Sequence, residues 1–257
     1  MMPSRKVLRR MSYFRDQDGI INRYLRERES WEEHLGYTKS FIASSFQDLE
    51  ADTVAVLGSG WLLDVPMDHL LSRFNRIILA DIAHPRQIRH KYRERKEVEF
   101  VECDLSGGAI DQVWQISKTA GDKAGRQEMI NEVSLKAPTE LDAADAFISV
   151  NLLNQLDILL VEFMEARFAL QQEELSGFRK KLQAFHLEWI GRKPGCLISD
   201  VKEISRDKTG NERVIDNLYA TLPEGMRRGK WTWNFDNSGS YRTGQQITMM
   251  VKAVEWA

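Results

Sequence analysis

The chain has 257 residues, of which 42% are hydrophobic and 29% are charged, and its formal net charge is −2. These values are typical of one α/β domain with a short appendage, and they argue against a disordered chain and against nucleic acid as the main partner. No uninterrupted apolar run reaches the roughly 18 residues of a transmembrane helix, so no membrane span is expected.

The cysteines and histidines indicate neither a disulfide nor a metal site. Cys103 and Cys196 both lie in apolar, strand-like runs, which favours buried thiols over a disulfide. The basic first ten residues lack the apolar segment of a secretory signal, so we expect a cytoplasmic protein. No Cys-x-x-Cys or His-x-x-x-His spacing occurs, so no metal site is expected.

Residues 1–50 are predicted to form a helical extension, and residues 51–257 the main domain. Apolar residues recur at helical spacing from Tyr13 to Glu29, and Ser30 followed by Glu33 resembles a capping box that opens a second helix. Such an extension either packs on the edge of the sheet or covers a ligand cleft. If it is a lid, its residues of interest are Tyr13, Trp31, His34 and Tyr37.

The first strand and the turn after it organise the rest of the chain. Val54–Leu57 is an apolar run typical of a buried parallel strand, and it leads into Gly58-Ser59-Gly60 and a helix from about residue 66. The strand at 76–81 ends in Asp81, about 20 residues after the glycine turn, where nucleotide-binding folds place the acid that holds a ribose.

The later elements continue the alternation of strands and helices. We expect strands at 97–103, 144–151, 196–201, 231–235 and 246–256, and helices at 86–95, 109–135, 156–190 (divided near 176–177) and 211–222. The last two strands flank a turn at 236–239 and are predicted to form a hairpin. Repeated β-α units indicate a parallel sheet with helices on both faces.

Polar residues follow four of these strands. They are the glycine turn, Asp81, Asp104, and Ser149 with Asn151. Because ligands of such sheets bind at the carboxyl ends of the strands, we expect these residues to converge on one cleft. Each position also has a purely structural interpretation, because glycines make tight turns and Asp, Ser and Asn cap helices or form turns.

With these residues in place, the chain resembles a class I S-adenosylmethionine-dependent methyltransferase over about residues 50–257. The resemblance implies a doubly wound, mostly parallel, seven-stranded sheet with helices on both faces and a C-terminal antiparallel hairpin. It also implies S-adenosylmethionine as the cofactor. The glycine turn would pass under its methionine part, Asp81 would hold the ribose, and Asp104 would approach the adenine amine.

The resemblance assigns further residues to the site. Its cofactor positions here are Leu57, Gly58, Ser59, Gly60, Asp81, Ile82, Asp104, Leu105 and Ser149. The positions expected to face the reacting methyl group and a small-molecule acceptor are Asn151, Asn154 and Gln155. Methyl transfer needs a general base only when the acceptor must lose a proton, and the candidates are His84, His186 and Asp200.

Two departures from the family pattern keep alternatives open. Val56 stands where the family usually carries an acid, and Leu62 replaces the third glycine of the turn. Both are compatible with a non-catalytic nucleotide-binding, S-adenosylmethionine-binding or regulatory protein on the same fold. A dinucleotide oxidoreductase is disfavoured, because the third glycine and a sixth β-α unit are absent. Trp231, Trp233 and Trp256 are interpreted as packing residues rather than a stacking platform.

Overall fold

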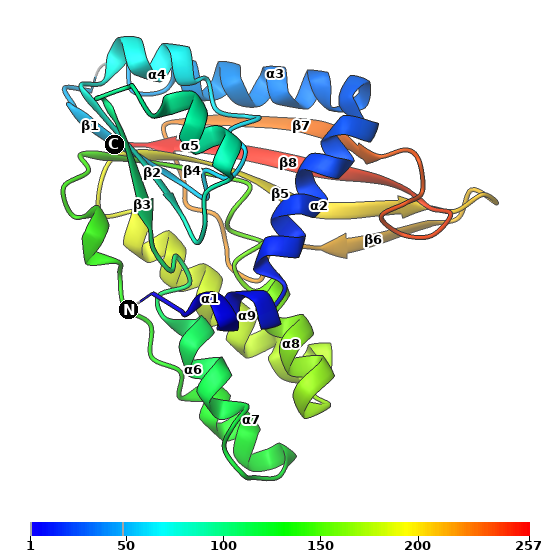
Figure 1. Cartoon of the computed structure of the whole chain (residues 1–257). Coiled ribbons are helices and arrows are strands. Elements are labelled where there is room, and N and C mark those ends of the chain that lie inside the picture. The colour runs from blue at the N-terminus through cyan, green and yellow to red at the C-terminus, as the bar shows by residue number, and fades with distance from the viewer. Residues whose placement is uncertain (1, 48) are drawn as a thin grey trace.

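The computed structural model describes residues 2–47 and 49–257, and it has three layers, with helices on both faces of one sheet (Figure 1). Met1 and Asp48, which belong to the predicted 1–50 extension, lie outside the described residues.

Within the described residues the sheet has eight strands, in the order β3-β2-β1-β4-β5-β8-β7, with β6 paired to β5. The strands are β1 (Thr53–Leu57), β2 (Arg76–Asp81), β3 (Val98–Glu102), β4 (Ala146–Val150), β5 (Gly195–Arg206), β6 (Glu212–Asp216), β7 (Arg227–Asp236) and β8 (Gln246–Trp256). Strands β1 to β5 are mutually parallel, whereas β6, β7 and β8 pair antiparallel. The predicted fold class and the C-terminal hairpin are therefore confirmed.

The sheet order places a crevice next to β1. The chain winds outward from β1 through β2 to β3, then returns to the other side of β1 with β4. The connections on the two sides of β1 therefore diverge, and the carboxyl ends of β1 and β4 leave room for a ligand between them.

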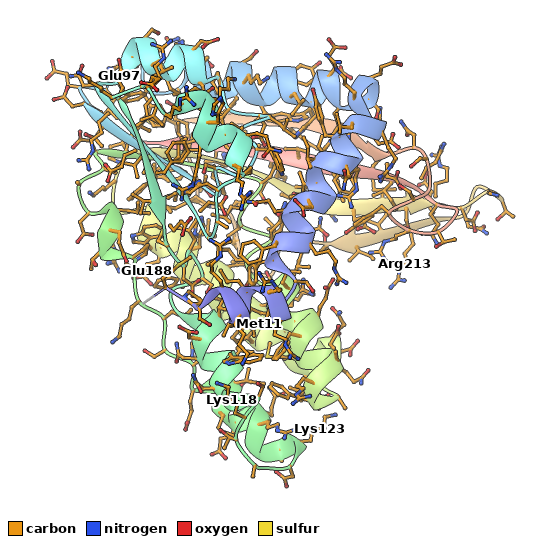
Figure 2. The ribbon with its side chains drawn as sticks, viewed as in Figure 1. Met11, Glu97, Lys118, Lys123, Glu188 and Arg213 are labelled. Carbon is orange, nitrogen blue, oxygen red and sulfur yellow. The ribbon has the colours of Figure 1, made fainter. Side chains whose placement is uncertain are left out.

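The helices divide between the two faces of the sheet. They are α1 (Arg5–Arg10), α2 (Tyr13–Arg26), α3 (Arg28–Ser44), α4 (Met67–Arg73), α5 (Arg86–Tyr92), α6 (Ala109–Ile116), α7 (Lys123–Asn131), α8 (Ile158–Phe168) and α9 (Gln172–Ile190). Figure 1 shows α3, α4 and α5 over one face and α6 to α9 below the other. Figure 2 shows Lys118 and Lys123 near the turn from α6 to α7, and Arg213 on the projecting β5–β6 hairpin.

Because successive side chains of a strand point to opposite faces of the sheet, β1 contributes to a hydrophobic core on each face. Val54 and Val56 of β1 pack in the cluster under α3, α4 and α5, whereas Ala55 and Leu57 pack in a cluster on the opposite face. All of β1 is buried, as expected of a central parallel strand covered on both sides.

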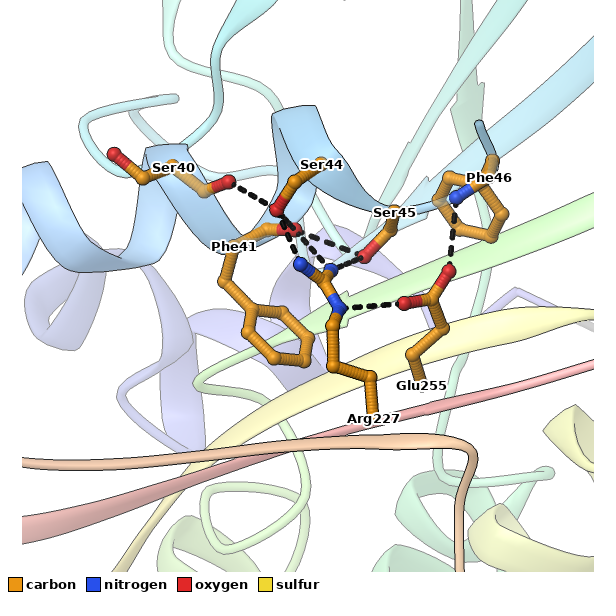
Figure 3. Close-up of polar contacts among 7 residues, drawn as sticks. All are labelled: Ser40, Phe41, Ser44, Ser45, Phe46, Arg227 and Glu255. Carbon is orange, nitrogen blue, oxygen red and sulfur yellow. Dashed lines mark hydrogen bonds and ion pairs between the residues drawn. The ribbon is translucent and has the colours of Figure 1, made fainter. Parts of the chain in front are cut away.

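Helix α3 is held onto the antiparallel end of the sheet. The Arg227 guanidinium of β7 pairs with the Glu255 carboxylate of β8, 2.8 Å away, and Glu255 Oε1 accepts a hydrogen bond of 2.9 Å from the Phe46 backbone N–H. The same guanidinium donates to the C-terminal turn of α3, at the Phe41 carbonyl and the Ser44 and Ser45 hydroxyls (Figure 3). This network fixes one end of α3 relative to β7 and β8.

The other two N-terminal helices continue from α3 toward the opposite face. Val7, Leu8 and Met11 in and beside α1 pack into the cluster formed by α6, α8 and α9, and α2 joins that side to α3. The predicted capping box is wrong, because α3 begins at Arg28 and the Ser30 hydroxyl donates to the Glu27 carbonyl, 2.8 Å away.

The predicted helix at 211–222 is also wrong. Residues 212–216 form β6, which pairs antiparallel with the end of β5, so the sheet has one strand more than the expected seven. The turn between them is built by Asp207, whose carboxylate accepts hydrogen bonds from Thr209 and Asn211. This Asx-type turn ends in Gly210 at φ 87°, a hairpin signal that the helical interpretation missed.

Two predicted helical regions divide differently from the expectation. Residues 156–190 break at 169–171 rather than 176–177: Ala169 adopts φ 54°, Gln171 and Glu174 form a capping box, and Gly177 lies inside α9. The 109–135 region contains two helices, α6 and α7, instead of one. Both cysteines are buried free thiols, and no helix in the described part of the chain combines the length and apolarity needed to cross a bilayer.

Candidate functional site

A cavity of about 320 Å³ opens at the carboxyl ends of the parallel strands. Its walls come from the loops after β1, β2, β3 and β4, from the middle of β5, and from α2, α3, α8, β7 and β8. In Figure 1, α2 runs from α3 above the sheet to α1 below it, and it lines the cavity through Tyr13, Asp16, Gln17, Ile20 and Arg23.

The glycine turn forms one wall of this cavity. Gly58 and Gly60 have φ values of 71° and 42°, a left-handed backbone that glycine adopts without strain. A Cβ at position 58 would lie 3.1 Å from Leu152 Cδ1, so the turn also needs the space. Leu62, which stands at the position of the third glycine of the family pattern, takes φ 54°, a left-handed conformation that is uncommon for leucine.

Asp81 connects the glycine turn to the end of β2. Its Oδ2 accepts a hydrogen bond of 2.7 Å from the Gly60 backbone N–H, while Oδ1 has only a long contact of 3.4 Å with the Ala83 N–H. Burial raises the pKa of Asp81 to about 6. The weakly held Oδ1 can therefore accept a hydrogen bond from a ligand hydroxyl.

Asp104, after β3, presents an oxygen without a partner. The residue is 8% exposed, and Oδ1 accepts hydrogen bonds from the Ser106 backbone N–H at 2.9 Å and from its hydroxyl at 2.5 Å. Oδ2 is buried and has no partner among the described residues. Leaving a buried acceptor unsatisfied costs about 1–3 kcal/mol, which an N–H donor on a ligand would recover.

The loop after β4 carries the predicted acceptor-side residues. Asn151 adopts φ 49° and its amide donates to Asp64 Oδ2 at 3.0 Å, which leaves Asn151 Oδ1 buried without a partner among the described residues. The Asn154 amide donates to Asp200 Oδ2 at 2.8 Å, and Gln155 also lines the cavity.

Asp200 is a buried carboxylate on the cavity wall. Its Oδ2 accepts hydrogen bonds from both Asn154 and Asn217, the latter at 2.9 Å, so Oδ1 carries no side-chain hydrogen bond within the described chain. Burial is the main cause that raises the pKa of Asp200 to about 6. A carboxylate with this pKa is largely ionised at neutral pH and can accept a proton.

Seven of the nine predicted cofactor residues line the cavity, and Leu57 and Ser149 do not. Leu57 and Ser149 are paired across β1 and β4, and Leu57 packs in the core cluster on the α9 side of the sheet. The Ser149 hydroxyl meets His186 Nε2 of α9 at 2.9 Å. The side chains of Leu57 and Ser149 therefore do not line the cavity.

Neither histidine proposed as a base is suited to the role. His186 is fully buried away from the cavity, and burial lowers its pKa to about 3. His84 meets the Ser59 hydroxyl at 3.5 Å and the Val101 carbonyl at 3.2 Å, and burial lowers its pKa to about 4. Both rings have structural roles at their positions.

The cavity has a pronounced excess of negative charge. Six carboxyl side chains line it against the single guanidinium of Arg23, within the part of the chain that is described: Asp16, Asp64, Asp81, Asp104, Glu162 and Asp200. The sequence analysis did not find Asp16, Asp64, Glu162 or Arg23. Asp64 lies in the long loop after the glycine turn, a signal that could have marked it, whereas the others are ordinary helix-surface residues in sequence.

The tryptophans of the C-terminal hairpin differ in their surroundings. Trp231 Nε1 donates to His34 Nδ1 at 3.0 Å, and Trp256 Nε1 donates to the Lys193 carbonyl at 2.8 Å, so both pack as expected. Trp233 belongs to the core cluster but also lines the cavity, together with Trp31 and His34 of the N-terminal extension. Tyr37 is 48% exposed and does not line it.

No family model matches the sequence, and no curated protein matches it. Some solved structures are similar to its structure. The 1,6-didemethyltoxoflavin-N1-methyltransferase of Burkholderia thailandensis, solved with 1,6-didemethyltoxoflavin and S-adenosylhomocysteine, is 10% identical, with 94% of this chain and 87% of that chain covered and a TM-score of 0.40. DhpI, in a complex named as containing SAH, is 11% identical, with coverages of 93% and 98% and a TM-score of 0.31.

These superpositions are too loose to transfer any residue's role, so the assignment of the fold rests on the strand order. The parallel β3-β2-β1-β4-β5 sheet, the antiparallel strands that close it and the helices on both faces match what the sequence resemblance implied. The chain has a doubly wound, Rossmann-like fold with a C-terminal antiparallel hairpin.

Proposed function

We propose that the chain binds S-adenosylmethionine in this cavity and transfers its methyl group to a small-molecule acceptor. The observation that carries the proposal is the convergence of the glycine turn, Asp81 and Asp104 from three strand ends. Two of the carboxylate oxygens there are available to a ligand: Asp81 Oδ1 is weakly held, and Asp104 Oδ2 has no partner within the described chain.

The residues present fit the cofactor. Asp104 Oδ2 would accept the adenine amine, Asp81 Oδ1 would accept a ribose hydroxyl, and the left-handed turn at Gly58 and Gly60 leaves open backbone under the methionine part. The excess of carboxylates favours a ligand with a sulfonium cation. The side chains of Ile82 and Leu105 add apolar surface beside the two acids.

When bound, S-adenosylmethionine supplies an activated methyl group on sulfur. The chain's own residues then mainly hold the acceptor in line and exclude water, and such alignment is worth about 7–11 kcal/mol. Asn151, Asn154 and Gln155 line the acceptor side of the cavity. For an acceptor that must lose a proton, the available base is Asp200, through its Oδ1.

Helix α2 is proposed as the cover of the site, which favours the lid interpretation of the extension for α2 while α3 packs on the sheet. The Gln17 side chain donates to the Ala83 carbonyl at 2.8 Å, and Trp61 Nε1 donates to the Gln17 carbonyl at 2.8 Å. These two bonds attach α2 to the loops after β1 and β2, directly over the cavity.

The alternative is a binding or regulatory protein on the same fold. Val56, in place of the usual acid, is a buried residue of the core cluster under α4, so it contributes packing there. Leu62, at the position of the third glycine, takes φ 54° and lines the cavity. The alternative predicts cofactor binding without production of S-adenosylhomocysteine for any acceptor tested.

Calorimetric titration with S-adenosylmethionine, S-adenosylhomocysteine and NAD tests the proposal. We expect the first two to bind and NAD not to bind. The D104A variant should weaken binding by about 5- to 150-fold, the equivalent of about 1–3 kcal/mol for one lost buried hydrogen bond. D207A, at an exposed turn far from the cavity, is the matched control. Binding of NAD alone, or no effect of D104A, would contradict the proposal.

A further inference from the structure

Most of the residues that carry a buried polar atom without a partner, within the described chain, line the cavity. Nine such side-chain atoms occur in the described chain, and five of them belong to residues that line this cavity. Asp104 Oδ2 is accounted for by the proposed cofactor. The other four are Arg23 Nε, His34 Nε2, Asn151 Oδ1 and Trp233 Nε1. Buried polar groups are normally satisfied, so this concentration indicates a second ligand.

A hydrogen bond from Trp231 determines which nitrogen of the His34 ring carries the proton. The Trp231 Nε1–H donates to His34 Nδ1 at 3.0 Å, so Nδ1 is the acceptor nitrogen and the ring proton sits on Nε2. Burial lowers the pKa of His34 to about 3, so the ring is neutral at ordinary pH. The unpaired Nε2 is therefore an N–H donor rather than a base.

His34 and Trp233 form a rigid pair. Their rings stack with centroids 4.0 Å apart and planes 6° apart, and Trp31 packs edge-on against Trp233 at 4.7 Å. The Trp31 N–H is satisfied by the Phe235 carbonyl at 2.9 Å, as the Trp231 N–H is by His34. The Arg227 network (Figure 3) anchors the end of α3 to the sheet. The ring stacking and this anchor together hold the two unsatisfied donors, on His34 and Trp233, in place.

Arg23 adds a third donor beside this pair. Its guanidinium lies 4.6 Å from the ring centroids of both Phe235 and Tyr241, and Phe235 packs against Trp233 at 4.8 Å. This end of the cavity therefore combines aromatic faces with three N–H donors that have no acceptor among the described residues.

We propose that this aromatic end of the cavity binds the methyl acceptor, and that the acceptor is a planar aromatic molecule bearing an uncharged carbonyl oxygen. The oxygen would receive the N–H groups of His34 and Trp233, and the ring would lie against the aromatic side chains. An uncharged oxygen is favoured over a carboxylate, because the carboxylates that line the cavity outnumber its one guanidinium in the described chain. This inference rests on the proposed function, since it names the substrate class of the same site.

The test uses small probes on the full chain saturated with S-adenosylhomocysteine. Benzamide offers a planar ring and a carbonyl, cyclohexanecarboxamide keeps the carbonyl without the planar ring, and aniline keeps the ring without the carbonyl. Ligand-observed NMR should detect benzamide binding in about the millimolar range expected of a fragment, with both analogues at least about tenfold weaker. Equal binding of the three probes, or no binding of benzamide, would overturn the proposal.

Two further measurements locate the contact. W233F keeps an aromatic ring but removes the N–H, and it should weaken benzamide binding about tenfold while leaving the affinity for S-adenosylhomocysteine unchanged. W256F, whose N–H serves Lys193 outside the cavity, is the control. If W233F does not fold, the indole N–H resonances of the native protein decide: benzamide should shift that of Trp233 but not that of Trp256.

The two proposals fail separately. If S-adenosylhomocysteine does not bind, the proposed function is wrong, whatever benzamide does. If S-adenosylhomocysteine binds and benzamide does not, or if W233F leaves benzamide binding intact, the cofactor site stands and the aromatic acceptor is wrong.

Discussion

Replacing Asp81 with asparagine is expected to stabilise the ligand-free protein while weakening the cofactor site. Burial raises the pKa of Asp81 from 3.8 to about 6. Since the charged form is the disfavoured one, the cost is absent at low pH and appears as the pH rises through this window. At neutral pH a shift of this size corresponds to at most about 3 kcal/mol.

The net gain is smaller than this limit. The Asp81 side chain is partly open to the cavity, so solvent screens some of the cost. Asparagine can keep the 2.7 Å bond from the Gly60 N–H through its oxygen, but its amide N–H₂ would face the N–H of Ala83 in place of a carboxylate oxygen. We therefore expect D81N to raise the free energy of unfolding by about 1 kcal/mol at pH 7.5.

Ligand binding should change in the opposite direction. The ribose hydroxyl loses its carboxylate acceptor, so the affinity for S-adenosylhomocysteine should fall by about 5- to 150-fold, the equivalent of about 1–3 kcal/mol. A purely structural role for Asp81 would predict the reverse pair of results, with a less stable protein and no direct effect on a ligand.

Urea unfolding at pH 7.5 and pH 5 and calorimetric titration at pH 7.5 test both parts. The stabilisation by D81N should fall by about half at pH 5, where the native carboxyl of the folded protein is already mostly protonated. D18N, on the exposed side of α2, controls for a general loss of negative charge. A variant that is destabilised at pH 7.5 and binds S-adenosylhomocysteine like the native protein would refute the reasoning.

Two further predictions concern buried histidines. Burial lowers the pKa of His34 and His186 to about 3 and of His84 to about 4, so the folded protein incurs no cost for keeping them neutral above about pH 6.5 and loses stability as the pH falls. Each histidine should lower the free energy of unfolding by about 2 kcal/mol at pH 5 in urea unfolding. Protonation of Asp81 and Asp200, whose pKa values are raised to about 6, should recover about half of this loss. S149A should remove the partner of His186 and lower stability by about 1–3 kcal/mol without changing the affinity for S-adenosylhomocysteine, and a loss of that affinity would return Ser149 to the cofactor site.

The strand ends were predictable because their signals are local. Buried parallel strands appear as apolar runs, and the residue after each strand lies at the same edge of the sheet. This rule correctly assigns Gly58, Asp81 and Asp104 to one cavity from sequence alone. Leu57 and Ser149 lie inside their strands, and the direction of their side chains, toward the α9 face, cannot be read from a run that is buried on both sides.

The strand β6 was missed for a different reason. Residues 212–216 pair with the part of β5 that extends beyond the irregular pairing at 200–202, and neither segment indicates this partner on its own. The length of β5 is set by the strands beside it, so the turn at 207–210 is the one local sign in the described chain that 212–216 is a strand.

The sequence by itself determined the alternation of strands and helices, the parallel sheet and the acids at its carboxyl edge, because each depends on residues close together in the chain. Only the tertiary structure decided the acceptor end of the cavity. His34 and Trp233 lie about 200 residues apart in sequence, and they meet because α3 packs across β7. Whether their N–H groups are satisfied depends on every neighbour in three dimensions, which no local pattern records.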